Sequence, residues 1–203
     1  MNHDHIFRAV LIVVLLVVFP IGIYHRLKSQ ETRERLDRRE EGLFILATLR
    51  PVGAAFWIGL IAWMVDPDWM AWSSVSLPLW LRWLGVGVMA IACGLLLWTF
   101  RCLGRNLTDT VVTRQKHTLV LHGPYRWIRH PFYDSAGLLT VAISLVAGNW
   151  FLFVTGVIGF GLLIIRTRTE EEHLVARFGD SYRTYMQRTG RFFPRIGANR
   201  RAT

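Results

Sequence analysis

Long runs of hydrophobic residues alternate with short polar segments along this chain. Apolar runs occupy residues 6–24, 43–65 and 79–100, and two shorter runs follow at 133–147 and 150–165. A helix needs about 20 residues to cross the hydrocarbon core of a bilayer. The pattern therefore predicts an all-α integral membrane protein with about five transmembrane helices, forming one membrane domain over residues 1–203.

The last two apolar runs predict a hairpin. Gly148 and Asn149 lie between them, and this dipeptide is typical of a tight turn. Each arm holds only about 15 to 16 apolar residues, fewer than the ~20 that a spanning helix uses. We therefore expect the pair to be tilted or to span the bilayer incompletely.

One charged residue interrupts the second run. Arg50 is followed by Pro51, which removes a hydrogen bond from the helix. Arg50 either reaches lipid headgroups from a kink near the interface or faces the interior of the protein. The sequence leaves both interpretations open.

Basic residues lie in blocks that alternate with segments holding no Lys or Arg. Residues 25–41 and 101–131 hold six basic residues each and the tail from Arg166 holds nine, whereas residues 66–78 and the hairpin turn hold none. Basic loops remain on the cytoplasmic side of a membrane. This alternation predicts an outside N-terminus and a cytoplasmic C-terminus in an inner (cytoplasmic) membrane. No small-residue cleavage site follows the first run, so we expect it to be a retained anchor.

Composition supports a membrane protein and limits the classes of partner. Hydrophobic residues make up 52% of the chain, and the mean hydropathy is +0.31. The net charge of +10 comes from residues beside apolar runs, which indicates anionic lipid and not nucleic acid as the partner. Cys93 and Cys102 have no metal-ligand spacing and form no disulfide framework, so we predict no metal site.

Two polar segments flank the predicted hairpin and should lie at the same end of it. Residues 117–133 read HTLVLHGPYRWIRHPFY, and residues 166–172 read RTRTEEE. Pro131 suits the first turn of a helix, whose N–H groups favour an anion or carboxylate. Arg166 and Glu170 are four residues apart and share a helical face. A simpler alternative is that these residues are interfacial anchors and a solvated acidic face.

These motifs resemble a known family of enzymes. HTLV, GPY, RHPFY and RTRTEEE, followed by FGDSYRTY and RFFP, are similar to the isoprenylcysteine carboxyl methyltransferase family, which is related to the phospholipid N-methyltransferases. The resemblance covers about residues 101–195, nearly half of the chain. It implies an integral-membrane enzyme that binds S-adenosyl-L-methionine in its C-terminal half, at the cytoplasmic face.

The resemblance also implies roles for single residues. The cofactor site would comprise His117, Thr118, Leu119, Val120, Tyr125, His130, Pro131, Phe132, Tyr133, Glu170 and Glu171. Arg166 and Glu170 would be catalytic: Glu170 would meet the amino group of the cofactor, and Arg166, with Arg129, would bind the substrate. Phe178, Gly179, Tyr182 and Tyr185 would pack the closing helix. Ser135 stands where the family usually has Gly, which affects the expected pocket floor.

We therefore expect methyl transfer to a lipophilic, membrane-embedded acceptor. A carboxylate acceptor is already ionised at neutral pH and needs no general base, so Arg166 favours it. An amine acceptor would need a base, and Glu171, Asp134 or His130 are the candidates. The alternatives are a phospholipid amine N-methyltransferase, a sterol-reductase-like NADPH enzyme and a non-enzymatic membrane adaptor. The sequence identifies neither the acceptor nor the oligomeric state.

Overall fold

The computed structural model describes residues 4–30, 43–103 and 119–195, and these are almost entirely helical. No strand occurs within these ranges, apart from two isolated bridge pairs. The α-helices are α1 (Asp4–Gln30), α2 (Leu43–Val65), α3 (Leu79–Leu103), α4 (Pro131–Ala147), α5 (Trp150–Phe178) and α6 (Asp180–Arg188). Two short 3-10 helices are η2 (Pro67–Ser73) and η4 (Gly123–Arg126). The all-α class is confirmed.

Helix length and composition fit a membrane protein. In the described part of the chain, α1, α2, α3 and α5 are long and apolar enough to cross a bilayer. Helix α4 is also apolar but has 17 residues, so it is shorter than a typical span. The membrane-protein fold is thus built from four long helices and one short one.

The expectation of two short hairpin arms is wrong for the second arm. Helix α5 continues without a break through Arg166 and the acidic run to Phe178, over 29 residues. Arg and Glu are good helix formers, so the change from apolar to charged sequence does not end the helix. It ends at Gly179, whose φ of +55° favours glycine. At 1.5 Å per residue, α5 is about 43 Å long and exceeds the hydrocarbon core.

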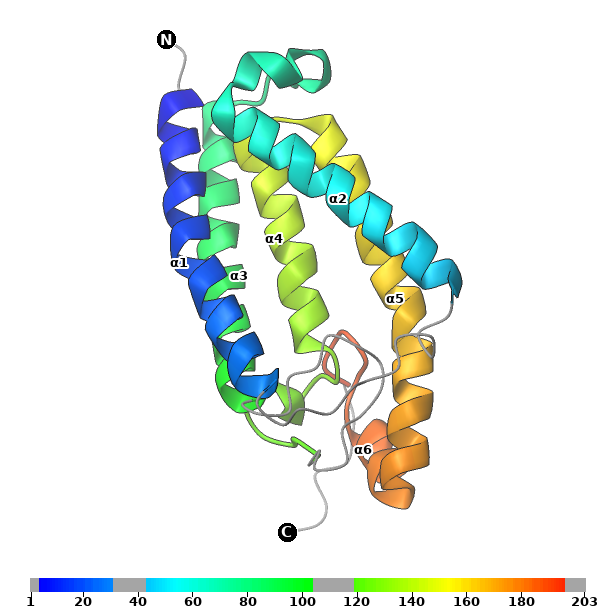
Figure 1. Cartoon of the computed structure of the whole chain (residues 1–203). Coiled ribbons are helices and arrows are strands. Elements are labelled where there is room, and N and C mark those ends of the chain that lie inside the picture. The colour runs from blue at the N-terminus through cyan, green and yellow to red at the C-terminus, as the bar shows by residue number, and fades with distance from the viewer. Residues whose placement is uncertain (1–3, 31–42, 104–118, 196–203) are drawn as a thin grey trace.

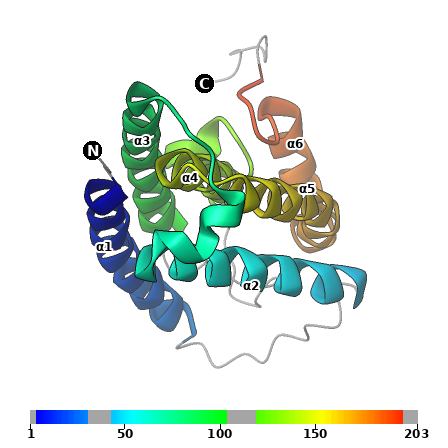
Figure 2. The same ribbon diagram turned by 90° about the horizontal axis from the view of Figure 1, so that it is seen from above.

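Helix α4 lies at the centre of the bundle, and it packs against α3 and α5 (Figures 1 and 2). Helix α2 crosses α5, and α1 lies beside α3 and α4. One buried cluster joins α1 to α5 toward the η2 end: Phe7, Leu11, Leu60, Trp63, Met70, Met89, Ala142, Ile143, Val146, Ala147 and Leu152. Helices α1 and α2 diverge away from this cluster (Figure 1).

The predicted turn at Gly148 and Asn149 is confirmed. Gly148 adopts the left-handed conformation, with φ of +59°, and ends α4. The Asn149 side chain caps α5 by accepting a hydrogen bond from the Leu152 N–H at 3.1 Å. Its Nδ2 also donates to Ser73 Oγ at 2.8 Å, which fixes the turn to η2.

Two arginines within the apolar helices differ in their environments. Arg82 pairs with Asp4 at 2.8 Å and donates to the Val146 carbonyl at 2.9 Å, so it connects α1, α3 and α4 at the η2 end. Arg50 is exposed and is not among the residues lining the central cavity. Its exposure favours the interpretation in which Arg50 reaches lipid headgroups.

Candidate functional site

A cavity of about 710 Å³ lies between the helices and borders the buried cluster, because Leu11, Met89 and Ile143 belong to both. Side chains of different character line its two ends. The polar end is formed by Tyr125, Arg129, His130, Tyr133, Arg166, Glu170, Tyr182 and Tyr185. The apolar end is formed by Leu11, Val14, Leu15, Val18, Phe19, Gly22 and Ile23 of α1 and by Leu49, Val52, Gly53, Phe56 and Trp57 of α2. Such a cavity can hold a charged group and an apolar chain at the same time.

The start of α4 positions the first side chains of the polar end. Gly123 opens η4 with φ of +63°, and a Cβ there would clash with Cys102 Sγ, so this close turn requires glycine. His130 caps α4 without a side-chain hydrogen bond, and Pro131 is the first helical residue. The rings of His130 and Tyr133 stack, with centroids 5.5 Å apart and planes 11° apart.

Helix α5 supplies the charged groups that face the cavity. Arg166 and Glu170 both line it, one helical turn apart. The Tyr133 hydroxyl donates a hydrogen bond of 2.7 Å to Glu170 Oε2. This bond fixes the Glu170 carboxylate at the wall of the cavity, where a cation can approach it.

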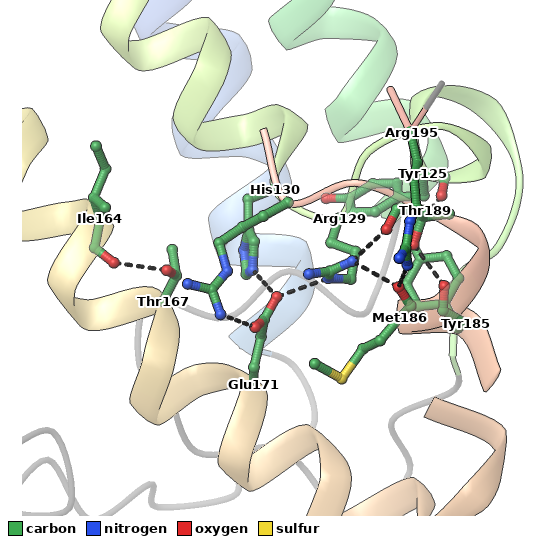
Figure 3. A network of polar contacts seen from close by, with 11 residues as sticks. Tyr125, Arg129, His130, Ile164, Thr167, Glu171, Tyr185, Met186, Thr189 and Arg195 are labelled. Atoms are coloured by element: carbon green, nitrogen blue, oxygen red, sulfur yellow. Dashed lines mark hydrogen bonds and ion pairs between the residues drawn. The ribbon is translucent and has the colours of Figure 1, made fainter. Parts of the chain in front are cut away.

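Glu171, the next residue, has a different environment (Figure 3). It is 3% exposed, and its Oε1 accepts from Arg129 Nε at 2.7 Å and lies 3.2 Å from His130 Nε2. Its Oε2 pairs with Arg191. The cavity lining includes Glu170 but not Glu171. These two adjacent acids therefore have different environments. Glu170 faces the cavity, whereas Glu171 does not line it and is held by basic side chains.

The segment after α6 is attached to the start of α4 by these cations and by backbone bonds. Arg129 Nη1 donates to the Thr189 carbonyl at 2.5 Å. The Arg129 N–H donates to Gly190 at 2.9 Å, and the His130 N–H donates to Arg191 at 3.1 Å. Residues 127–130 and 189–191 therefore form one unit around Glu171.

Tyrosine side chains close the polar end. The Tyr185 hydroxyl donates to the Tyr125 carbonyl at 2.6 Å, which joins α6 to η4. Burial raises the pKa of the Tyr125 hydroxyl well above its usual value, and the nearby Glu170 adds to the shift. Burial likewise raises the pKa of Tyr182 and of Tyr185. These hydroxyls remain neutral donors throughout the physiological range of pH.

Most of the residues predicted for the site lie together. The cavity is lined by Leu119, Val120, Tyr125, Arg129, His130, Phe132, Tyr133, Arg166 and Glu170. Pro131 and Glu171 lie behind the lining residues, and His117 and Thr118 fall outside the described ranges. Sequence reasoning missed Arg191 and the lining residues of α1 and α2. The RFFP motif was a signal for Arg191, whereas nothing distinguished the lining residues of α1 and α2 from lipid-facing ones.

Two other residues that were considered from the sequence, Ser135 and Asp134, do not line the cavity. Ser135 is fully buried, and its hydroxyl donates to the Pro131 carbonyl at 2.8 Å within α4. Among the described residues, no three His, Cys, Asp or Glu side chains are grouped so that they could hold a metal ion.

Known proteins resemble part of this chain. A resistance protein to nickel, cobalt and cadmium from Alcaligenes xylosoxydans is 28% identical over 56% of this chain and 53% of its own length. The protein-S-isoprenylcysteine O-methyltransferase of Schizosaccharomyces pombe is 29% identical over 48% of each chain. This chain thus spans about half the length of these relatives.

A solved structure shares the fold. The eukaryotic intramembrane Ras methyltransferase, an isoprenylcysteine carboxyl methyltransferase, superposes with a TM-score of 0.55 at 24% identity, over 72% of this chain and 52% of its own. The sequence pattern of phospholipid methyltransferases matches residues 80–181, which is half of the chain and includes α3 to α5. On that match, the chain belongs to the phospholipid methyltransferase family.

Proposed function

We propose that this protein transfers a methyl group from S-adenosyl-L-methionine to a carboxylate on a lipophilic acceptor within the membrane. The observation that carries the proposal is the single cavity with two ends. Glu170 and Arg166 line one end of it, and apolar side chains of α1 and α2 line the other. A methyltransferase for such an acceptor needs this combination, because a charged donor and an apolar acceptor must meet in one place.

The groups of the polar end fit the proposed cofactor. S-adenosylmethionine carries an ammonium, a sulfonium, a carboxylate and an aromatic base. The Glu170 carboxylate, oriented by Tyr133, suits the cationic groups. The first turn of α4 suits a carboxylate, and Tyr125, Phe132 and Tyr182 offer aromatic surface for the base. The bound cofactor supplies an activated methyl group, while the protein supplies orientation and a dry site.

The chain's own residues account for the remaining requirements of the reaction. Arg166 lies one turn from Glu170 and pairs with the acceptor carboxylate, which is already ionised at neutral pH. No general base is needed for this acceptor. Glu171, which does not line the cavity, neutralises the lining residue Arg129 and also Arg191, so that Glu170 is the carboxylate that faces the bound cation. Water is excluded by the tyrosines and by the apolar end.

We also propose that the polar end faces the cytoplasm and that the cap expected from the sequence, residues 101–131 and 166–203, covers the cofactor; residues 104–118 and 196–203 lie outside the described ranges. The first turn of α1 and the last turn of α5 lie at opposite ends of the bundle (Figure 1). The blocks of basic residues support a cytoplasmic position for the α6 end. Cysteine labelling of Arg183→Cys and of Trp69→Cys in intact cells, with Cys93 and Cys102 replaced by alanine, tests this orientation. A membrane-impermeant reagent should label only position 69.

Cofactor binding is the first test of function. Isothermal titration of the detergent-solubilised protein should show binding of S-adenosylhomocysteine and none of NADPH. Binding of NADPH alone would overturn the assignment. Glu172→Gln, at an exposed neighbour of the site, should bind S-adenosylhomocysteine as the unmodified protein does.

The acceptor group is the second test. Membranes incubated with tritiated-methyl S-adenosylmethionine should incorporate label into an extractable lipid. A methyl ester loses this label in mild base, whereas an N-methyl or S-methyl group retains it. Base-stable label would overturn the carboxylate assignment and leave the methyltransferase assignment intact.

A further inference from the structure

The mouth of the cavity can be located from its exposed lining residues. Among the described lining residues, the three exposed ones are Phe19, Ile23 and Trp57, at 57%, 44% and 41%. All three lie on α1 or α2, inside segments apolar enough to span a bilayer. A side chain that both lines a cavity and meets the surroundings lies at its edge. The cavity therefore opens sideways, between α1 and α2, toward the hydrocarbon of the membrane.

An aromatic pair bridges this mouth. The rings of Phe19 and Trp57 meet edge to face, with centroids 6.1 Å apart and planes at 73°. Beside the pair, both helices carry a lining glycine. A Cβ added at Gly53 meets nothing within 4 Å, and one added at Gly22 lies 3.9 Å from Phe100. The mouth thus has a bulky bridge on one side and open space beside it.

The volume limits what can enter. Pockets of about 300–1,000 Å³ hold one drug-sized ligand. The proposed donor is a ligand of that class, so it takes up a large part of the 710 Å³ cavity once it is bound. The remaining space and the bridged mouth leave room for a narrow apolar group.

Resting on the proposed function, we propose that Phe19 and Trp57 select acceptors that carry a single apolar chain and exclude lipids with two chains. The chain lies in the passage beside Gly53, with its polar group directed to Arg166. Both aromatic residues lie outside residues 80–181, the segment that matches the family. They can therefore determine which acceptors bind without changing the residues that hold the donor.

The test compares two radiolabelled lipids with the same headgroup. Lysophosphatidylserine has one chain and phosphatidylserine has two, and both carry a carboxylate that can pair with Arg166. Each is bound to immobilised, solubilised protein in the presence of S-adenosylhomocysteine in a scintillation proximity assay. The unmodified protein should prefer the one-chain lipid by about tenfold or more, equivalent to ~1.4 kcal/mol. In Phe19→Ala/Trp57→Ala this preference should fall below about threefold. The controls Leu16→Ala and Trp80→Ala, at exposed residues outside the lining, should retain it.

A second pair of variants tests the passage itself. Gly53→Leu fills the open space at the mouth and should weaken binding of lysophosphatidylserine about tenfold. Gly87→Leu is the matched control, because a Cβ there also meets nothing within 4 Å and Gly87 does not line the cavity.

Four results would overturn the inference: binding of neither lipid, equal binding of both by the unmodified protein, an unchanged preference in the double variant, or equal behaviour of the two leucine variants. S-adenosylhomocysteine titration of the same preparations reports on the donor site separately. Loss of that binding in the unmodified protein would overturn the proposed function and not the selectivity of the mouth.

Discussion

The polar and apolar ends of the cavity are built in opposite ways. At the polar end, both Glu170 and Glu171 have defined partners: Tyr133 for Glu170 and three basic side chains for Glu171. At the apolar end, α1 and α2 diverge, and their lining residues include Gly53, which has open space beside it. One end holds its side chains in fixed positions, and the other leaves room.

This difference follows the family match. Helices α4 and α5 lie within the matched segment, residues 80–181, whereas α1 and α2 lie outside it. A reaction with one donor and varied acceptors needs a constant donor site and an adaptable acceptor site. We therefore infer that the polar end sets the chemistry and that the apolar end sets the choice of acceptor.

The largest effect is expected at Glu171, because its carboxylate contacts three basic side chains and its removal breaks all of these contacts. Glu171→Ala leaves Arg129, whose side chain is 9% exposed, and the partly exposed Arg191 without their carboxylate, and breaking a buried ion pair such as that of Arg129 costs about 3–5 kcal/mol. We expect the apparent melting temperature in detergent to fall by about 10 °C. Asp180→Ala, which removes only the exposed pair with Arg183, should change it little. Equal melting temperatures would show that the polar end is not held by this cluster.

Glu170→Gln tests whether the fixed carboxylate serves the donor. The substitution retains the shape and removes the charge that faces the cavity. A hydrogen bond to a charged group contributes about 1.5–3 kcal/mol, so binding of S-adenosylhomocysteine should weaken by about 10- to 150-fold in calorimetry. Glu172→Gln, at the exposed neighbour, provides the matched control. If both variants bind alike, Glu170 has no special role.

The sequence predicted the polar end better than the apolar end, and the reason is physical. Charged and aromatic residues in an apolar chain are rare and therefore informative, so Arg166, Glu170 and Tyr133 stood out. Helical spacing also separated Glu170 from its neighbours. It did not show that Glu171 binds Arg191, because that contact depends on how α6 returns to the start of α4.

Apolar residues carry no such signal. Phe7 belongs to the buried cluster, Phe19 lines the cavity mouth and Leu16 is exposed on the lipid-facing surface, and all three fit one hydrophobic run. In a bilayer both faces of a helix are apolar, so periodicity does not reveal which one meets a cavity. The length of α5 was missed for a related reason. The apolar run ends before the helix does, because helix formation does not require hydrophobic residues.

Arg166→Ala sharpens the boundary between the two ends. Arg166 lies on α5, one turn from the proposed donor-binding residue Glu170, yet we assign Arg166 to the acceptor carboxylate. The variant should raise the KM for the acceptor about tenfold or more, while binding of S-adenosylhomocysteine changes less than about threefold. Arg183→Ala, at an exposed arginine, should alter neither quantity. A parallel loss of donor binding would move Arg166 into the donor site.

The smallest effect is expected at Tyr133, whose hydroxyl orients Glu170 without meeting the substrate. Tyr133→Phe keeps the stacked ring beside His130 and removes one hydrogen bond, which contributes about 0.5–1.5 kcal/mol. Donor binding should weaken by about two- to tenfold, and the acceptor KM should not change. In the Glu170→Gln background the same substitution should have little further effect, because the two side chains act as one unit. Additive losses in the double variant would show that Tyr133 acts on the donor directly and not through Glu170.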